Sequence, residues 1–143
     1  FEIAPIICYE DILPRYIRKF SELRPNVFVN MTNDAWFGKT AEPMLHLALA
    51  MMRTVEHRKW LVRSTNTGVS AFVDPNGRMV QHTSIYEPEI LRQSVAMMPR
   101  TRTIYSYIGD ILGWIALIWI VFLAIARRKN NKNASQIDKK EAQ

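Results

Sequence analysis

An uncharged apolar run near the C-terminus constrains this chain more than any other feature of its sequence. The run extends from Ile111 to Ala126 without a charged side chain, and counted from Ile104 it covers 23 residues with Asp110 as the only charge. As a helix, a segment of that length rises roughly 34 Å, which is enough to cross a hydrocarbon core of about 30 Å. A buried helix in a domain this small rarely needs apolar side chains on every face. The sequence therefore predicts a transmembrane helix over residues 104–126.

Basic residues follow this run directly, at Arg127, Arg128, Lys129 and Lys132. Positive charge beside a span tends to stay in the cytoplasm, so we expect a cytoplasmic C-terminus and residues 1–103 on the other side of the membrane. Residues 127–143 carry almost no apolar side chains and are expected to form a disordered basic tail. That tail supplies most of the excess of 19 Lys and Arg over 13 Asp and Glu. The other basic residues are scattered among acidic ones, so no nucleic-acid partner is expected.

Cys8 is the only cysteine of the 143 residues, which excludes an intrachain disulfide framework. It ends an apolar run typical of a buried strand, and a segment with helical periodicity follows, in which Asp11 is the expected cap and Pro14 fits only the first turn. A thiol at such a junction feels the positive end of the helix dipole, which favours the nucleophilic thiolate. Glu10 would share its side of the chain if extended geometry persisted. The alternative is an inert cysteine that packs as a small hydrophobic residue.

The periodicity of the remaining residues predicts a layered α+β sheet domain. We expect a buried strand over 27–31, a long helix from about residue 43 to 62, a hairpin with strands 70–73 and 78–82, and a weaker strand over 90–97. His46 and His57 lie too far apart on the long helix to share a metal, and no metal site is predicted. One apolar stripe of that helix is expected to face the core: Met44, Leu45, Ala48, Met51, Met52 and Val55. Because the chain begins within a strand and without Met, we expect it to be a fragment that lacks the first half of this domain.

Three sequence blocks, in this order, resemble the carbon–nitrogen hydrolase (nitrilase) superfamily. They are Ile-Cys-Tyr-Glu-Asp at 7–11, Asn-Asp-Ala-Trp-Phe-Gly at 33–38 and Arg-Ser-Thr-Asn-Thr-Gly-Val-Ser-Ala at 63–71. Followed by a span and a basic tail, they are most similar to the apolipoprotein N-acyltransferases within that superfamily. The resemblance implies a nitrilase-like αββα sandwich, with residues 1–103 as its C-terminal half, held outside the bacterial inner (plasma) membrane by one transmembrane helix. It also implies transfer of an acyl chain from a phospholipid, through a cysteine thioester, to the N-terminal amine of a diacylglyceryl-cysteine apolipoprotein.

By this resemblance Cys8 is the nucleophile, and Tyr9 and Glu10 match the family's Cys-Tyr-Glu, in which the second acid supports the site. The family's Glu base and oxyanion-stabilising Lys have no counterpart here and are expected upstream, so the chain alone is expected to be inactive. Trp36 and Phe37 are expected to contact the acyl chain, with ordinary packing as the alternative. No cofactor is expected. Two other functions stay open: a membrane-anchored nitrilase-family amidase that hydrolyses a small carbon–nitrogen substrate, and a membrane-tethered binding module with an inert Cys8.

Overall fold

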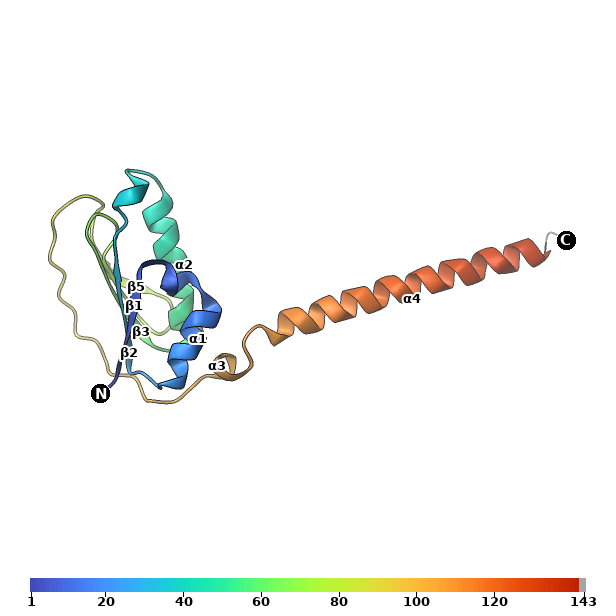
Figure 1. Cartoon of the computed structure of the whole chain (residues 1–143), viewed down its shortest axis with the longest axis horizontal. Coiled ribbons are helices and arrows are strands. Elements are labelled where there is room, and N and C mark those ends of the chain that lie inside the picture. The colour runs from blue at the N-terminus through green and yellow to red at the C-terminus, as the bar shows by residue number, and fades with distance from the viewer. Residues whose placement is uncertain (142–143) are drawn as a thin grey trace. The chain divides into compact units, whose positions relative to one another are not determined.

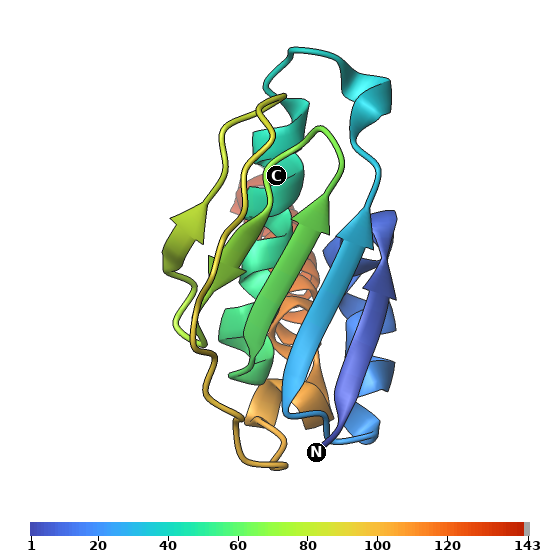
Figure 2. The ribbon, with the colours of Figure 1, turned by 90° about the vertical axis from the view of Figure 1, so that its left-hand side faces the viewer.

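The computed structural model describes the backbone of residues 1–141 and the side chains of residues 1–128. The chain forms two compact units, the first from Phe1 to Gly109 and the second beginning at Asp110. The first unit is built on a five-stranded sheet, whose strands lie in chain order (Figures 1 and 2). The strands are β1 (Ile3–Ile7), β2 (Val27–Thr32), β3 (Trp60–Thr65), β4 (Ala71–Val73) and β5 (Met79–His82). The first three run parallel and the last three antiparallel, which confirms the α+β class.

Helices cover one face of this sheet. Both α1 (Pro14–Glu22) and α2 (Glu42–His57) lie on that face, because each connects two parallel strands and must cross back over the sheet (Figure 2). Two 3-10 helices, η1 (Cys8–Ile12) and η2 (Ala35–Phe37), follow β1 and β2. The extended chain between β5 and α3 (Ile104–Ile108) passes over the opposite face, where Ile90 and Leu91 approach Val62 and Phe72.

The register of the sheet places its core and a polar layer in adjacent rows. Ala4, Phe28, Leu61 and Val73 form one row, and all four are buried beneath the helices. The next row toward the carboxyl ends of the parallel strands consists of Ile6, Asn30, Arg63 and Ala71. All four residues are buried, and two of them, Asn30 and Arg63, are polar. Buried polar groups require partners. The sheet therefore carries an internal polar cluster at the end where the functional loops begin.

The expected long helix over 43–62 is wrong at its C-terminal end. α2 ends at His57, Arg58 takes a left-handed conformation with φ of 53°, and Trp60 already begins β3, the strand that the sequence analysis missed. A left-handed residue ends a helix because it breaks the repeating backbone geometry. Residues 90–97, which the structure describes in full, form no strand, so that expectation is also wrong.

The expected inward stripe of α2 is wrong as well. Met44, Leu45, Ala48, Met52 and Val55 are exposed, and Met51 is only partly buried against the core. The sheet instead contacts the opposite side of α2, which mixes apolar and polar residues: Pro43, His46, Leu47, Ala50, Arg53, Thr54 and His57. Hydrophobic periodicity did not predict which side of α2 faces the sheet, because the outer side of this helix is apolar too.

The segment expected to be one helix over 104–126 is interrupted at residues 109–110. Thr103 caps α3 by accepting a hydrogen bond from the Ser106 N–H, and Gly109 follows with φ of 59°. The helix α4 then runs from Ile111 to Glu141, so the backbone of the expected disordered tail is helical to that residue. A helix that is already nucleated can propagate into a polar segment at little cost. Residues 111–128 form the one candidate span of the described chain, with mean hydropathy 2.0 and no buried part.

Candidate active site

Three loops meet at the carboxyl ends of β1, β2 and β3. Parallel strands place these ends at one edge of the sheet, so the segments that follow them become neighbours. The Asn66 side chain donates to Asn33 Oδ1 at 2.8 Å, and the ring of Tyr9 packs edge-on against Phe37 with centroids 5.9 Å apart. The three sequence blocks that resemble the nitrilase superfamily therefore form one site.

Cys8 occupies a sharp turn directly after β1. Its φ is 51°, a left-handed conformation that costs a non-glycine residue on the order of 1 kcal/mol or more, and its free thiol is partly exposed. The helix that starts here is a five-residue 3-10 helix, and α1 begins only at Pro14. Cys8 thus begins a helix, as expected, but that helix is a short 3-10 helix and not the start of α1. The position of Pro14 in the first turn is confirmed, but Asp11 does not cap α1.

Two side chains hold this turn from either side. Glu10 folds back so that Oε2 accepts from the Ile7 N–H at 2.7 Å, while Oε1 accepts from the Tyr16 hydroxyl at 2.7 Å. On the other side, Asn30 Nδ2 donates to the Cys8 carbonyl oxygen at 3.2 Å. The bond to Glu10, followed by partial burial, raises the pKa of Tyr16. The backbone on both sides of Cys8 is thus tied to side chains of other elements.

Beneath the Cys8 turn lies a buried cluster of polar side chains, each at most 2% exposed: Asp11, Asp34, His46 and Arg63. Arg63 donates through Nη1 to Asp11 Oδ2 at 2.5 Å and through Nη2 to Asp34 Oδ2 at 3.2 Å. His46 sits between the same two carboxylates, with Nε2 2.9 Å from Asp11 Oδ1 and Nδ1 3.2 Å from Asp34 Oδ1. Arg63 Nη1 also donates to Asn30 Oδ1 at 3.1 Å, which connects the cluster to the residue that holds Cys8.

The third block closes this cluster through Gly68. A Cβ atom at residue 68 would lie 2.3 Å from Asp34 Oδ2, so only glycine lets the backbone approach that carboxylate. Within the described residues, no group of three His, Cys, Asp or Glu side chains is arranged to hold a metal ion. The guanidinium of Arg63 lies between the two carboxylates instead. The cluster is therefore suited to holding the backbone of the Cys8 turn in position.

The three aromatic residues expected to bind substrate differ in their surroundings. Tyr9 stacks on the His46 ring, with centroids 4.5 Å apart and planes 9° apart, and its hydroxyl donates to Glu42 at 2.9 Å. Partial burial and then the bond to Glu42 raise the pKa of Tyr9 to about 12. Phe37 is half-buried beside Tyr9, whereas Trp36 is 83% exposed. The structure brings Tyr9 and Phe37 together in the loops around Cys8, and it leaves the Trp36 ring exposed.

The buried cluster was not predicted from the sequence, although most of its members lie within the three blocks. Asp11 ends the first block, Asp34 belongs to the second and Arg63 begins the third. A charged residue inside a buried strand, as Arg63 is in β3, was the available signal, because such a residue is almost never fully buried without a partner.

Comparisons with known proteins agree on the family of this region. The carbon–nitrogen hydrolase family model matches residues 2–100. The apolipoprotein N-acyltransferase 2 of Leptospira interrogans is 40% identical over 119 residues, which cover 81% of this chain and 20% of that protein. The apolipoprotein N-acyltransferase of Bradyrhizobium diazoefficiens is 43% identical over 125 residues, covering 87% and 23%. The chain thus spans about a fifth to a quarter of the length of these relatives.

A solved structure shows a weaker likeness. It is a mutant of the amidase from Nesterenkonia sp. AN1, in which acrylamide has undergone Michael addition at the active-site cysteine. The TM-score is 0.47 at 19% sequence identity, and the alignment covers 58% of this chain and 35% of the amidase.

Proposed function

The chain belongs to the carbon–nitrogen hydrolase family, and from that premise we propose that it is the C-terminal part of an apolipoprotein N-acyltransferase. The family match confirms the resemblance drawn from the three blocks and, with it, the nitrilase-like fold. Relatives named apolipoprotein N-acyltransferase match more than four-fifths of the chain, including residues beyond the family model. The apolar helix after the domain fits membrane anchoring, and the names of these relatives favour the acyltransferase over a membrane-anchored amidase.

The observation that carries this function is the geometry of Cys8. Its thiol is partly exposed on a left-handed turn that Glu10 and Asn30 hold in place, at the edge where all three family blocks meet. A strained backbone persists only where the surroundings enforce it, and such sites are frequently catalytic. An inert cysteine would need neither the turn nor the polar cluster beneath it.

The proposed reaction has two half-reactions. In the first, the Cys8 thiolate attacks the ester carbonyl of a phospholipid, a thioester forms, and the lysophospholipid leaves with its hydroxyl proton restored. In the second, the neutral N-terminal amine of a diacylglyceryl apolipoprotein attacks the thioester, an amide forms, and the thiol is released with one proton from the amine. The base and the oxyanion-stabilising Lys of the family are proposed to lie upstream of this chain.

Glu10 is proposed as a positioning residue in this reaction. Both of its oxygen atoms are engaged, one by the Ile7 N–H and one by the Tyr16 hydroxyl, so that it supports the turn and does not face a reacting proton. Tyr9, Phe37 and the exposed Trp36 are proposed to line the path of the acyl chain, because they are the aromatic side chains of the loops around Cys8.

The uncovered sheet face supports the expectation that residues 1–103 are half of a sandwich. Ile3, Ile7 and Met31 point away from the helices and are each about half exposed, at 48%, 52% and 50%. An open apolar face of this kind requires a second layer in water. We propose that the upstream half of the domain supplies that layer together with the missing Glu and Lys, so that the chain alone is inactive.

The location is proposed to be the bacterial inner membrane, with α4 as the anchor. Arg127 and Arg128 form the C-terminal end of the candidate span, and positive charge favours the cytoplasmic side. A reporter fused after Gln143 should therefore be active only in the cytoplasm. Activity of a periplasmic reporter at that position would overturn the proposed orientation.

Acyl transfer to Cys8 tests the function directly. The full-length protein that contains this chain is incubated with a labelled phospholipid, and a hydroxylamine-sensitive adduct on the protein is measured. Cys8→Ala should abolish the adduct, Cys8→Ser should leave at most a trace because a hydroxyl is a poor nucleophile without a base tuned for it, and the exposed Arg92→Ala serves as the matched control. An undiminished adduct in Cys8→Ala would place the nucleophile elsewhere. Release of free fatty acid at a rate independent of the acceptor amine would mean that water, and not an amine, accepts the acyl group, which would contradict the proposed transferase.

A further inference from the structure

The outward side of α2 is apolar along most of its length. Met44, Leu45, Leu49, Met52 and Val55 are between 37% and 53% exposed, and Ala48 between them is exposed as well. Their spacing places them on one side of the helix over about 17 Å. The two acidic residues of α2, Glu42 and Glu56, lie before and after this strip along the helix. We call these six residues the α2 strip.

A helix that packs one side on a sheet normally presents polar residues to water on the other. α2 reverses this pattern, because His46, Arg53, Thr54 and His57 are buried while the α2 strip faces outward. A helix that is apolar on its outer side is covered by something in the working protein.

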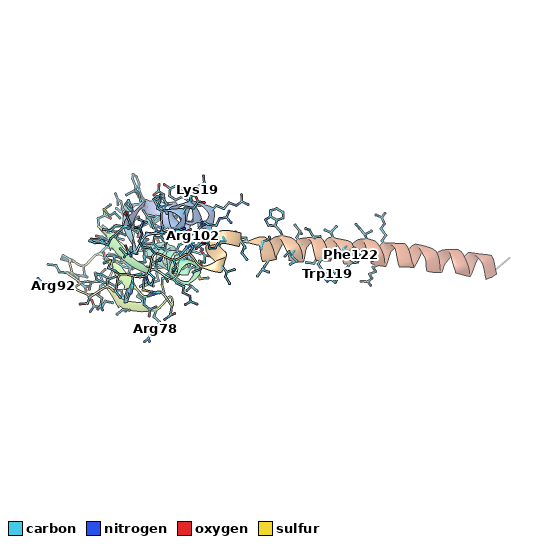
Figure 3. All side chains as sticks on the ribbon, turned by 90° about the horizontal axis from the view of Figure 1, so that it is seen from below. Lys19, Arg78, Arg92, Arg102, Trp119 and Phe122 are labelled. Carbon is cyan, nitrogen blue, oxygen red and sulfur yellow. The ribbon has the colours of Figure 1, made fainter. Side chains whose placement is uncertain are left out.

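The charge next to the α2 strip indicates what covers it. α1 lies beside α2 on the same face of the sheet (Figure 2). Its outer side exposes Arg15 and Lys19 together with Glu22, and Lys19 projects from the surface of the unit (Figure 3). An apolar strip beside basic side chains is the pattern of a surface that rests on anionic phospholipid. A second copy of the same face would bring the basic residues of two α1 helices together.

The C-terminal end of α2 is bonded to α3, the last helix before the candidate span. At the last turn of α2, His57 Nδ1 and the Ser106 hydroxyl lie 2.8 Å apart, and the Thr103 hydroxyl donates to the Glu56 carbonyl oxygen at 2.5 Å. These bonds fix α3 to the C-terminal end of α2. The candidate span begins at Ile111, three residues after α3 ends, so the connectivity of the chain limits how far this end of α2 can move from an anchored span.

We propose that the α2 strip lies in the interface of the phospholipid bilayer, with Arg15 and Lys19 of α1 toward anionic headgroups. This docking rests on the proposed membrane anchoring. It holds the catalytic unit by a second contact besides α4 and restricts how far the Cys8 loops can turn away from lipid.

Lipid quenching of a probe on the α2 strip tests this proposal. The full-length protein carries Cys8→Ala, with any other cysteine outside this chain removed, and an environment-sensitive fluorophore at Met52→Cys. It is reconstituted into vesicles of phosphatidylethanolamine and phosphatidylglycerol, at about three to one, with brominated or unmodified acyl chains. We expect brominated lipid to remove roughly half of the emission, because an interfacial helix buries its apolar side about 5–10 Å into the acyl boundary.

The matched control places the same fluorophore at Arg92→Cys, an exposed site on the segment after β5 (Figure 3). Its emission should be insensitive to brominated lipid. Double replacement of Arg15 and Lys19 by Glu should lower the quenching at Met52 in these vesicles and leave it unchanged in vesicles without phosphatidylglycerol. That difference would support contact with anionic headgroups.

Two results would overturn the docking. Quenching at Met52 by aqueous iodide but not by brominated lipid would mean that the strip faces water. Protection from both quenchers would mean that protein covers it, either a second copy or another part of the full-length chain. The proposed function is measured separately, as adduct formation on protein with Cys8 intact, so either proposal can fail while the other stands.

Discussion

Replacement of Arg63 by methionine tests whether the buried cluster holds the Cys8 turn in place. Arg63 is 2% exposed and bonds both Asp11 and Asp34, which are themselves fully buried. Methionine fills a similar volume but leaves the two carboxylates without their shared cation. Removing one partner of a buried ion pair costs about 3–5 kcal/mol, since the remaining charge stays desolvated. For a domain of 150–250 residues this lowers the melting temperature by roughly 6 to 20 °C.

Three comparison variants separate charge from shape. Arg63→Lys keeps the charge, but a point-like ammonium cannot match the planar fork that reaches Asp11, Asp34 and Asn30 at once, so we expect an intermediate loss. Adding Asp11→Asn to Arg63→Met should restore part of the stability, because it removes one uncompensated charge. The exposed Arg92→Met should change stability by no more than about 0.5 kcal/mol.

The measurement is thermal unfolding of the full-length protein in detergent, followed by the rate of Cys8 acylation well below the transition. Arg63 contacts Asn30, and Asn30 holds the Cys8 carbonyl, so acylation of Arg63→Met should slow even where the protein is folded. If Arg63→Met melts at the same temperature as Arg92→Met, the cluster carries no electrostatic stabilisation. The account of the Cys8 turn would then be refuted.

Three further predictions address single residues. Glu10→Ala should slow Cys8 acylation by roughly 10²- to 10⁴-fold in adduct kinetics, whereas Glu10→Gln, which keeps an acceptor for Ile7, should recover much of the rate. Burial and then nearby cations lower the pKa of the His57 imidazole to about 4. As the pH falls, this imidazole is therefore protonated in the unfolded protein before it is protonated in the folded protein, which favours unfolding. Stability should drop by about 3 kcal/mol between pH 6.5 and 4, and His57→Asn should flatten this part of the melting profile. Gly68→Ala should lower the melting temperature by displacing Asp34, while Gly113→Ala, with no atom within 4 Å of the added carbon, should not.

The strands that the sequence predicted correctly are those with a clear local signal. β1 and β2 are apolar runs bounded by turns, and the β4–β5 hairpin surrounds a turn in which Asp74 accepts from the Asn76 and Arg78 N–H groups. The start of β3 has no such boundary, because Arg58 ends α2 in a left-handed conformation that arginine does not favour. Local propensity cannot predict that break, since the pairing of β3 with β2 on one side and β4 on the other enforces it.

The buried cluster escaped prediction for a different reason. Its members are separated along the chain by as many as 52 residues, between Asp11 and Arg63, and no sequence period connects them. The three sequence blocks predicted the location of the site, because their order is a property of the family. What each buried polar residue contacts becomes clear only from the register of the sheet. That register places Asn30 beside Arg63 and both in the row of Ile6, two residues before the nucleophile.

The free-energy cost of burying this cluster indicates its role. Burying two carboxylates, a guanidinium and an imidazole stabilises a domain no better than apolar residues of the same volume would. Charged groups instead fix the orientation of the groups that they bond, because each hydrogen bond constrains an angle as well as a distance. Here the contacts converge on Asn30, which holds the Cys8 carbonyl, and on the ring of Tyr9, the residue next to Cys8. A thiol that must meet a lipid ester in one orientation needs such a rigid support, and a merely stable fold does not.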